Sequence, residues 1–198
     1  MTFVVGITGS IAVGKSTVTN YLLQHGYIVL DADKITHDAY IKGNECYYQV
    51  VKEFDCLDEN NNIDRKKLGN IVFNDSAAKK KLENIVHPYV VKCLKQGIEK
   101  SKEKLIFLDI PLLYEAHLEY LCDKIIVVYV DKQLQIERLK ERNKISFEQA
   151  EFLVGKQMSI EDKKNKADYV IDNRVYFEEL FKNIESVLEV IKSENLFK

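Results

Sequence analysis

The sequence predicts an α/β protein with a doubly wound, mostly parallel five-stranded sheet, and three observations support this fold class. A stretch from Gly9 to Ser16 follows the first apolar run and matches the pattern G-x-x-x-x-G-K-[ST]. Short apolar runs then alternate with stretches of helical periodicity, which favours parallel strands joined by helical crossovers. The chain has 198 residues, of which 46% are hydrophobic and 30% charged, so it can bury the core of one globular domain.

The first predicted strand is the apolar run from Phe3 to Ile7, and helical spacing of apolar residues begins at Val18. The glycines between them let the backbone fold around an anion, so that N–H groups and the helix N-terminus face phosphate oxygens. Lys15 would add a mobile positive charge, and Ser16 would hold Mg²⁺. We therefore predict a nucleotide phosphate site; a glycine-containing turn with an exposed lysine is the weaker alternative.

The second predicted strand is the run from Tyr27 to Leu30, which we expect to be buried and to end in Asp31-Ala32-Asp33. Ligands of open α/β sheets bind at the carboxyl ends of the strands, so both carboxylates are expected near the phosphate loop. A second role for Asp33 is to cap a helix over Lys34 to Tyr40.

The segment from Asn44 to Ser101 has no strong strand pattern and is expected to form several lysine-rich helices. Asp64 would cap a helix over residues 65–73, and a longer helical pattern runs from Ser76 toward Gly97. His87-Pro88 interrupts the longer pattern, because a proline removes a hydrogen bond and should kink or break the helix. The lysine-rich faces are most simply solvated surface, with binding of an acidic substrate as the alternative.

The last part of the chain contains three more predicted strands, at residues 105–108, 124–130 and 169–171. The first of them ends in Asp109, where a second carboxylate that organises Mg²⁺ would be needed. A helix over residues 133–142 would carry Arg138 and Arg142 on one face, although a solvated surface explains such arginines equally simply. Ser146 and Gln149 would form a capping box for a helix through Met158, and residues 177–191 would form a closing amphipathic helix.

Composition restricts the partners and the compartment. The formal net charge of -2 provides no basic field for nucleic acid. The four cysteines form no C-x-x-C pair, which disfavours zinc and predicts free thiols in a reducing compartment. The longest apolar run, residues 125–130, is too short to span a bilayer, and no targeting signal is visible. We therefore expect a cytoplasmic protein without a nucleic-acid or membrane partner, and the oligomeric state is left open.

Further motifs give a more specific interpretation. They are, in order along the chain, Asp31-Ala32-Asp33, His87-Pro88, residues 109–115, Gln157-Met158 and residues 167–173. With these motifs in this order and at similar spacing, the whole chain resembles the dephospho-coenzyme A kinase family. The resemblance implies transfer of the γ-phosphoryl group of ATP to the ribose 3′-hydroxyl of dephospho-coenzyme A, the last step of coenzyme A synthesis. It also implies a fold similar to nucleoside monophosphate kinases, with a core (1–43, 102–132 and 166–198), a helical coenzyme A subdomain (about 44–101) and a lid (about 133–165).

The resemblance and the chemistry of phosphoryl transfer together suggest the site residues. ATP would be bound by Gly9, Ala12, Val13, Gly14, Lys15, Ser16, Thr17 and Asn173. The acceptor would be bound by Thr8, Asp33, His87, Asp109 and Leu112, with no assigned role for His87. The catalytic candidates are Lys15, Asp33 for the proton of the 3′-hydroxyl and Arg142 for charge in the transition state. Mg²⁺ would accompany ATP, held by Ser16 and, through water, by Asp33 or Asp109.

Five positions differ from the family pattern: Ser10, Ala12, His37, Leu153 and Arg174. The first two stand where glycine is common, the next two where arginine is common, and the last where a small residue is usual. These differences affect fine details of phosphate contact and the shape of the adenine-side loop. Two other hypotheses are kept: a different small-molecule kinase on the same fold, and a nucleotide-binding switch without catalysis.

Overall fold

The computed structural model describes residues 2–195 of the chain, which divide into two compact units. The first unit comprises the residues up to Leu30 and those from Ser101 onward, and the second comprises Asp31–Lys100. Within residues 2–195, no helix combines the length and the apolar character needed to cross a membrane. The cysteines are free thiols, as predicted.

A five-stranded sheet forms the centre of the first unit, in the order β2-β3-β1-β4-β5. The strands are β1 (Phe3–Thr8), β2 (Ile28–Asp31), β3 (Leu105–Asp109), β4 (Lys124–Tyr129) and β5 (Tyr169–Asp172). The central strand β1 pairs in parallel with β3 and β4, and β4 pairs in parallel with β5. The predicted α/β fold with five strands is confirmed. Because β1 and β3 are parallel, the phosphate loop and Asp109 both follow carboxyl ends of neighbouring strands.

The prediction that the second strand is buried is wrong. β2 lies at the edge of the sheet, and Ile28 is exposed. An apolar run of four residues has the same pattern in an edge strand as in a central one, so the sequence alone could not separate the two cases.

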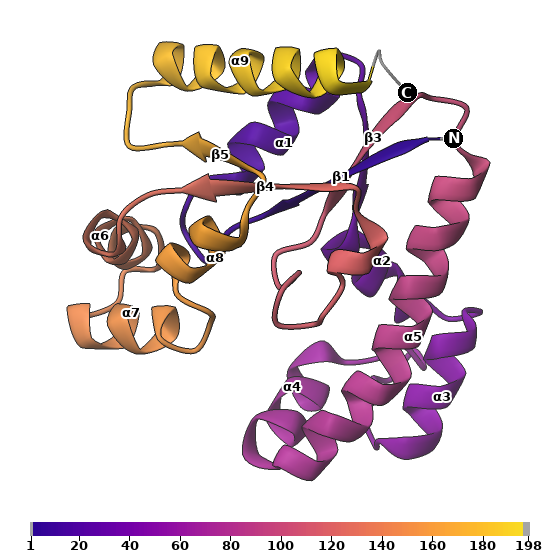
Figure 1. Ribbon diagram of the computed structural model, residues 1–198. Helices are drawn as coiled ribbons and strands as arrows, with labels where there is room; N and C mark the ends of the chain where they lie inside the picture. Colours follow the sequence, from indigo (N-terminus) through magenta and orange to yellow (C-terminus); the bar gives the residue numbers. More distant parts are fainter. Residues whose placement is uncertain (1, 196–198) are drawn as a thin grey trace. The chain divides into compact units, whose positions relative to one another are not determined.

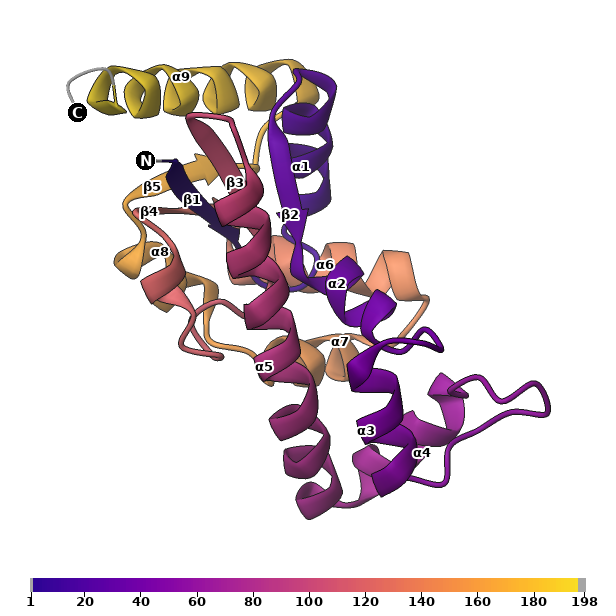
Figure 2. The same cartoon turned by 90° about the vertical axis from the view of Figure 1, so that its right-hand side faces the viewer.

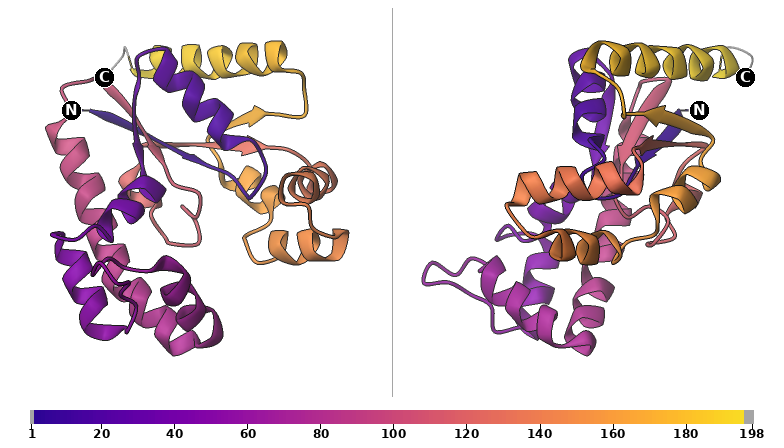
Figure 3. Two further views of the ribbon diagram at one scale, coloured as in Figure 1. Left: turned by 180° about the vertical axis from the view of Figure 1, so that it is seen from behind. Right: turned by 90° about the vertical axis from the view of Figure 1, so that its left-hand side faces the viewer.

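Helices cover both faces of the sheet in the first unit. Helices α1 (Lys15–Gln24) and α9 (Phe177–Asn195) lie on one face, and α8 (Ile160–Lys166) lies on the other (Figures 1 and 3). Helix α9 buries residues at helical spacing, namely Leu180, Ile184, Leu188 and Ile191. The sequence analysis did not expect α8, because its residues 160–166 are mostly charged.

Helices α6 (Lys132–Asn143) and α7 (Phe147–Val154) pack against each other, and we call them the lid helices. The capping box predicted at Ser146 and Gln149 is present. Helix α7 ends at Val154 and not at Met158, because the N–H groups of Lys156 and Gln157 donate to the carbonyls three residues earlier, at 3.3 and 3.2 Å, and so form turns. A single-turn 3₁₀ helix, η1 (Glu119–Leu121), precedes β4.

The second unit is helical. It contains α2 (Ala32–Ala39), α3 (Glu45–Glu53), α4 (Arg65–Asn74) and α5 (Ser76–Lys100), and the first three pack on α5 (Figure 2). The predicted cap of α4 is present, since the Asp64 carboxylate accepts the N–H groups of Lys66 and Lys67 at 2.9 and 3.1 Å. This compact unit begins at Asp31 because α2 packs on α3 and α5.

Two details expected for the second unit are corrected. Of the kink or break expected at Pro88, the break is absent, since α5 is helical from Ser76 to Lys100. Buried Val86 and Val90, on either side of the proline, hold this part of α5 in place, and such packing offsets the lost hydrogen bond. The cap of α2 is Asp31, whose carboxylate accepts the Lys34 N–H at 3.0 Å, while Asp33 lies in the first turn.

Candidate active site

The N-terminus of α1 is open to an anion. Helix α1 begins at Lys15, and its N-cap residue is Gly14 in the left-handed conformation, with φ 84°. No described side chain caps this helix and its first turn has no acidic residue, whereas Asp131 caps α6. The Thr17 N–H donates to the Gly14 carbonyl at 3.0 Å, so the N–H groups of Lys15 and Ser16 and the positive end of the helix dipole are the groups available for phosphate oxygens. Ser16, the next residue of this turn, is exposed.

Asn173 holds the phosphate loop (Gly9–Ser16) from behind. Its side-chain amide donates to the Val13 carbonyl at 2.8 Å, and its own N–H donates to the Tyr129 carbonyl at 2.8 Å. A Cβ atom at Gly14 would overlap the Asn173 side-chain nitrogen. Gly14 therefore has two independent reasons to be glycine, the positive φ and the missing space.

The apex of the phosphate loop is held by one side chain near the start of α6 and by residues just after α7. The Ile11 N–H donates to Gln157 Oε1 at 2.8 Å, and the Ile11 carbonyl accepts from Gln135 Nε2 at 2.7 Å. The Ser10 hydroxyl donates to the Met158 carbonyl at 3.2 Å. Ala12 has φ 63°, a conformation that favours glycine, and it packs with Ile11 against the hydrophobic cluster of the lid helices.

The structure brings two predicted site residues into direct contact, since Lys15 Nζ forms an ion pair with Asp109 Oδ1. Asp109 is the last residue of β3 and is buried, so the carboxylate is held beside the start of α1. Thr8 is also buried, and its hydroxyl donates to the Pro111 carbonyl at 3.0 Å, which commits the hydroxyl proton to the protein. Leu112, in contrast, is exposed.

Lys163 is a residue of this site that the sequence analysis missed. It is fully buried, and its ammonium contacts Glu115 Oε1 at 2.9 Å and the Pro111 carbonyl at 3.0 Å. Burial lowers the pKa of Lys163, and the contact with the Glu115 carboxylate acts in the opposite direction. No sequence signal identified the lysine, because a lysine within a charged stretch is usually solvated. Glu115 closes the motif of residues 109–115.

The two arginines of α6 differ in their contacts. Arg138 donates to the Asn173 carbonyl at 3.0 Å and thereby supports the loop behind Gly14. Arg142 is exposed and donates to Asn143 Oδ1 at 3.1 Å.

Arg174, at a position that differs from the family pattern, forms a two-nitrogen contact with the Asp172 carboxylate and lies over the Tyr129 ring. This contact lowers the pKa of the Asp172 carboxyl.

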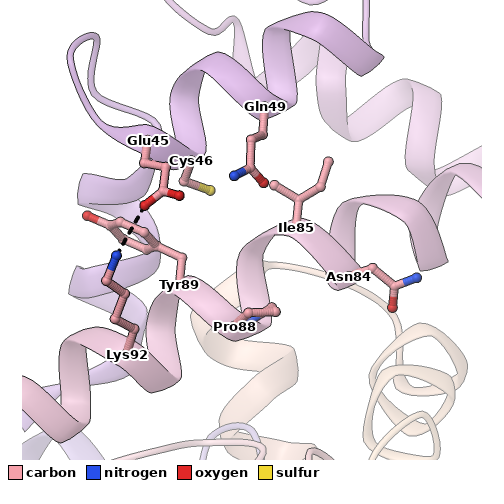
Figure 4. Close-up of a pocket in the computed structure, with 8 residues that line it drawn as sticks. All are labelled: Glu45, Cys46, Gln49, Asn84, Ile85, Pro88, Tyr89 and Lys92. Atoms are coloured by element: carbon pink, nitrogen blue, oxygen red, sulfur yellow. Dashed lines mark hydrogen bonds and ion pairs between the residues drawn. The ribbon is translucent and has the colours of Figure 1, made fainter.

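Two predicted site residues, Asp33 and His87, belong to the second unit and are both exposed. A pocket of about 150 Å³ lies in this unit between α3 and α5, with an ion pair between Glu45 and Lys92 at 3.2 Å (Figure 4). Its lining residues are Glu45, Cys46, Gln49, Asn84, Ile85, Pro88, Tyr89 and Lys92. His87 is not among them: it lies about 200° around α5 from Ile85 and Tyr89, and about 60° from Asn84.

Oxygen donors for Mg²⁺ are present but sparse. The described residues contain no group of three or more His, Cys, Asp or Glu that could hold a metal ion. A Mg²⁺ ion that arrives with ATP does not need such a group, because phosphate oxygens and water supply most of its ligands. The exposed Ser16 hydroxyl and the Asp109 carboxylate, both hard oxygen donors, fit this requirement.

Comparison with known proteins identifies the family. A family model described as dephospho-CoA kinase matches residues 3–179. The chain belongs to the dephospho-CoA kinase family. A dephospho-CoA kinase of Fusobacterium nucleatum is 44% identical over 190 residues, which cover 95% of this chain and 98% of that protein. Members of this family are ATP-dependent kinases, and so is this chain.

Solved structures agree with this family assignment. The dephospho-CoA kinase from Campylobacter jejuni is 35% identical, with a TM-score of 0.76 over 98% of this chain and 100% of that chain. TT1252 from Thermus thermophilus is 30% identical, with a TM-score of 0.81 over 98% and 97% of the two chains.

The geometry at Gly14 leads to a test with a matched control. Gly14→Ala should raise the Kd for ADP by about tenfold or more, because the new methyl group must displace Asn173 and the left-handed conformation adds strain. Gly26 has a similar φ of 80° but open space around its Cβ position. Gly26→Ala should therefore cost about 1 kcal/mol of folding stability and leave ADP binding intact. Calorimetric ADP titration and urea unfolding measure the two quantities, and equal ADP affinity in both variants would contradict the account of Gly14.

Proposed function

We propose that this chain transfers the γ-phosphoryl group of ATP to the ribose 3′-hydroxyl of dephospho-coenzyme A. The observation that carries the proposal is the uncapped N-terminus of α1 beside the Lys15–Asp109 ion pair, in a chain of the dephospho-CoA kinase family. Phosphoryl transfer needs little covalent chemistry from a protein, because positioning and charge neutralisation provide most of the catalysis. The N-terminus of α1 can position phosphates, and Lys15 can neutralise their charge.

The phosphate loop would bind the donor. The N–H groups at the start of α1 would hold the phosphates, and Lys15 would turn from Asp109 toward the β- and γ-phosphates. Mg²⁺ bound with ATP would neutralise phosphate charge, with Ser16 as its protein ligand and Asp33 or Asp109 acting through water. The remaining donor contacts predicted at Gly9, Ala12, Val13, Gly14, Thr17 and Asn173 are also part of this proposal.

The second unit would bind the acceptor. Asp33 follows the carboxyl end of β2 and would accept or orient the proton of the 3′-hydroxyl. His87 does not line the α3–α5 pocket, so we assign His87 to the acceptor site and leave the pocket outside it. Small-molecule substrates of this kind, together with free cysteines, are consistent with a cytoplasmic enzyme that has no nucleic-acid partner.

The proposed lid is smaller than residues 133–165. Helix α8 packs on β4, and its Lys163 is fully buried, so we assign α8 to the core and restrict the lid to α6 and α7. Arg142, exposed near the end of α6, would supply positive charge to the transition state when the lid helices close over ATP.

A panel of acceptors tests the proposed reaction. The purified chain with Mg-ATP should release ADP with dephospho-coenzyme A and add one phosphoryl group, located at the ribose 3′-position by mass spectrometry and NMR. Nucleoside monophosphates, pantothenate and shikimate serve as competing acceptors. Efficient phosphorylation of one of these without reaction of dephospho-coenzyme A would indicate another small-molecule kinase, and no transfer to any acceptor would indicate a nucleotide-binding protein without catalysis.

Asp33→Asn tests the proton acceptor. The amide keeps the size of the side chain but removes its negative charge, so turnover should fall by about 10² while ADP affinity persists. Asp38→Asn is the matched control, since Asp38 lies in the same helix α2 and its side chain is half exposed. Steady-state kinetics of both variants decide the role. Near-normal turnover of Asp33→Asn would show that the carboxylate is not needed for chemistry.

Arg142→Ala tests the lid. Turnover should fall by about 10³ if the guanidinium neutralises charge in the transition state, and Arg142→Lys should recover little, because an ammonium lacks the planar fork. Lys140→Ala, an exposed position in the same helix, should leave turnover unchanged. A higher KM for dephospho-coenzyme A with unchanged kcat would instead make Arg142 a substrate-binding residue.

A further inference from the structure

Lys163 has an unusual environment for a lysine. It is fully buried in α8, while Lys166 of the same helix is exposed. Lysines are rarely buried completely unless their charge is paired. A fully buried ammonium therefore implies a set of acceptors arranged for it.

Three oxygen atoms surround the ammonium of Lys163. They are Glu115 Oε1 at 2.9 Å, the Pro111 carbonyl at 3.0 Å and the Gly9 carbonyl at 3.5 Å. An ammonium has three N–H donors, so each donor has one acceptor. Two of the acceptors are main-chain carbonyls, which means that Lys163 also holds backbone in place.

The two carbonyls come from the two segments that form the donor site. Gly9 is the first residue of the phosphate loop, and Pro111 follows Asp109 by two residues. The Thr8 hydroxyl also donates to the Pro111 carbonyl, at 3.0 Å. One side chain thus connects the loop that carries Lys15 with the segment that carries its partner Asp109.

Glu115 extends this cluster toward the lid helices. Its Oε1 atom accepts the Met158 N–H at 3.0 Å, and the Met158 carbonyl accepts the Ser10 hydroxyl at 3.2 Å. The chain leaving α7 is therefore tied both to the Lys163 ion pair and to the phosphate loop. The charge of Lys15 contributes to the lowered pKa of Lys163, so the two ammonium groups lie within electrostatic range of each other.

We propose that Lys163 is a positioning residue for phosphoryl transfer: by binding the carbonyls of Gly9 and Pro111, it fixes the phosphate loop relative to the Asp109 segment. The inference rests on the proposed function for its turnover measurement. A lysine that only neutralised Glu115 would act through the ion pair, whereas Lys163 acts on the reaction through the two carbonyls. Its removal should therefore affect the donor side more than the acceptor side.

The test separates the carbonyl contacts from the ion pair. Either single substitution leaves one charge of a buried pair without its partner, so urea unfolding first checks that each variant folds. In Glu115→Gln the amide oxygen can still accept a hydrogen bond from the lysine, so the key comparison is between Glu115→Gln and the double variant Glu115→Gln/Lys163→Met. Glu115→Gln keeps the lysine on both carbonyls and should lose about threefold in kcat. The double variant should lose about tenfold more, with the KM for dephospho-coenzyme A changed by less than about threefold. Lys166→Met is the control for the substitution and should behave as the unsubstituted chain.

Two outcomes would overturn the proposal. If both variants kept nearly the kcat of the unsubstituted chain, Lys163 would only fill space, and if both lost about thirtyfold in kcat, the ion pair would be the important contact. ADP titration provides a measurement that does not depend on the acceptor, and the double variant should bind ADP about tenfold more weakly than Glu115→Gln. If the unsubstituted chain left dephospho-coenzyme A unreacted, the proposed function would fail while the ADP measurement still tested Lys163.

Discussion

The backbone of the phosphate loop needs hydrogen-bond partners that neither β1 nor α1 can supply. A buried backbone group without a partner costs about as much as a lost hydrogen bond, so later parts of the chain must provide these partners. Four side chains provide them: Gln135 of α6, Gln157 after α7, Lys163 of α8 and Asn173 after β5. The arrangement of the first unit thus follows from the need to hold one short loop in an irregular conformation.

Two ion pairs give the same region its charge balance. Lys15 pairs with Asp109 and Lys163 pairs with Glu115, so both acids belong to the stretch that begins at the end of β3. Removing one partner of a buried pair leaves an uncompensated charge, which is strongly destabilising. The parallel pairing of β1 with β3 therefore sets the electrostatics of the site as well as the shape of the sheet.

The sequence predicted the parts of this arrangement that depend on local patterns. The phosphate loop, the five strands and the capping box each depend on a few neighbouring residues, and all are present. The exposure of β2, the uninterrupted α5 and the burial of Lys163 depend on what packs against them, which no local pattern contains. The same limit applies to the candidate site: the contact between Lys15 and Asp109 could be anticipated from strand ends, whereas the role of Gln135 could not.

The packing of Ile11 and Ala12 against Ile136, Leu139, Ala150 and Val154 has a consequence for how the enzyme can be divided. The lid helices complete their hydrophobic core with two residues of the phosphate loop, which lie more than a hundred positions earlier in the sequence. A chimaera that took only α6 and α7 from a relative would combine an interior from one protein with a loop from another. The smallest block that can be exchanged as a unit therefore includes the loop, both lid helices and the glutamines that connect them.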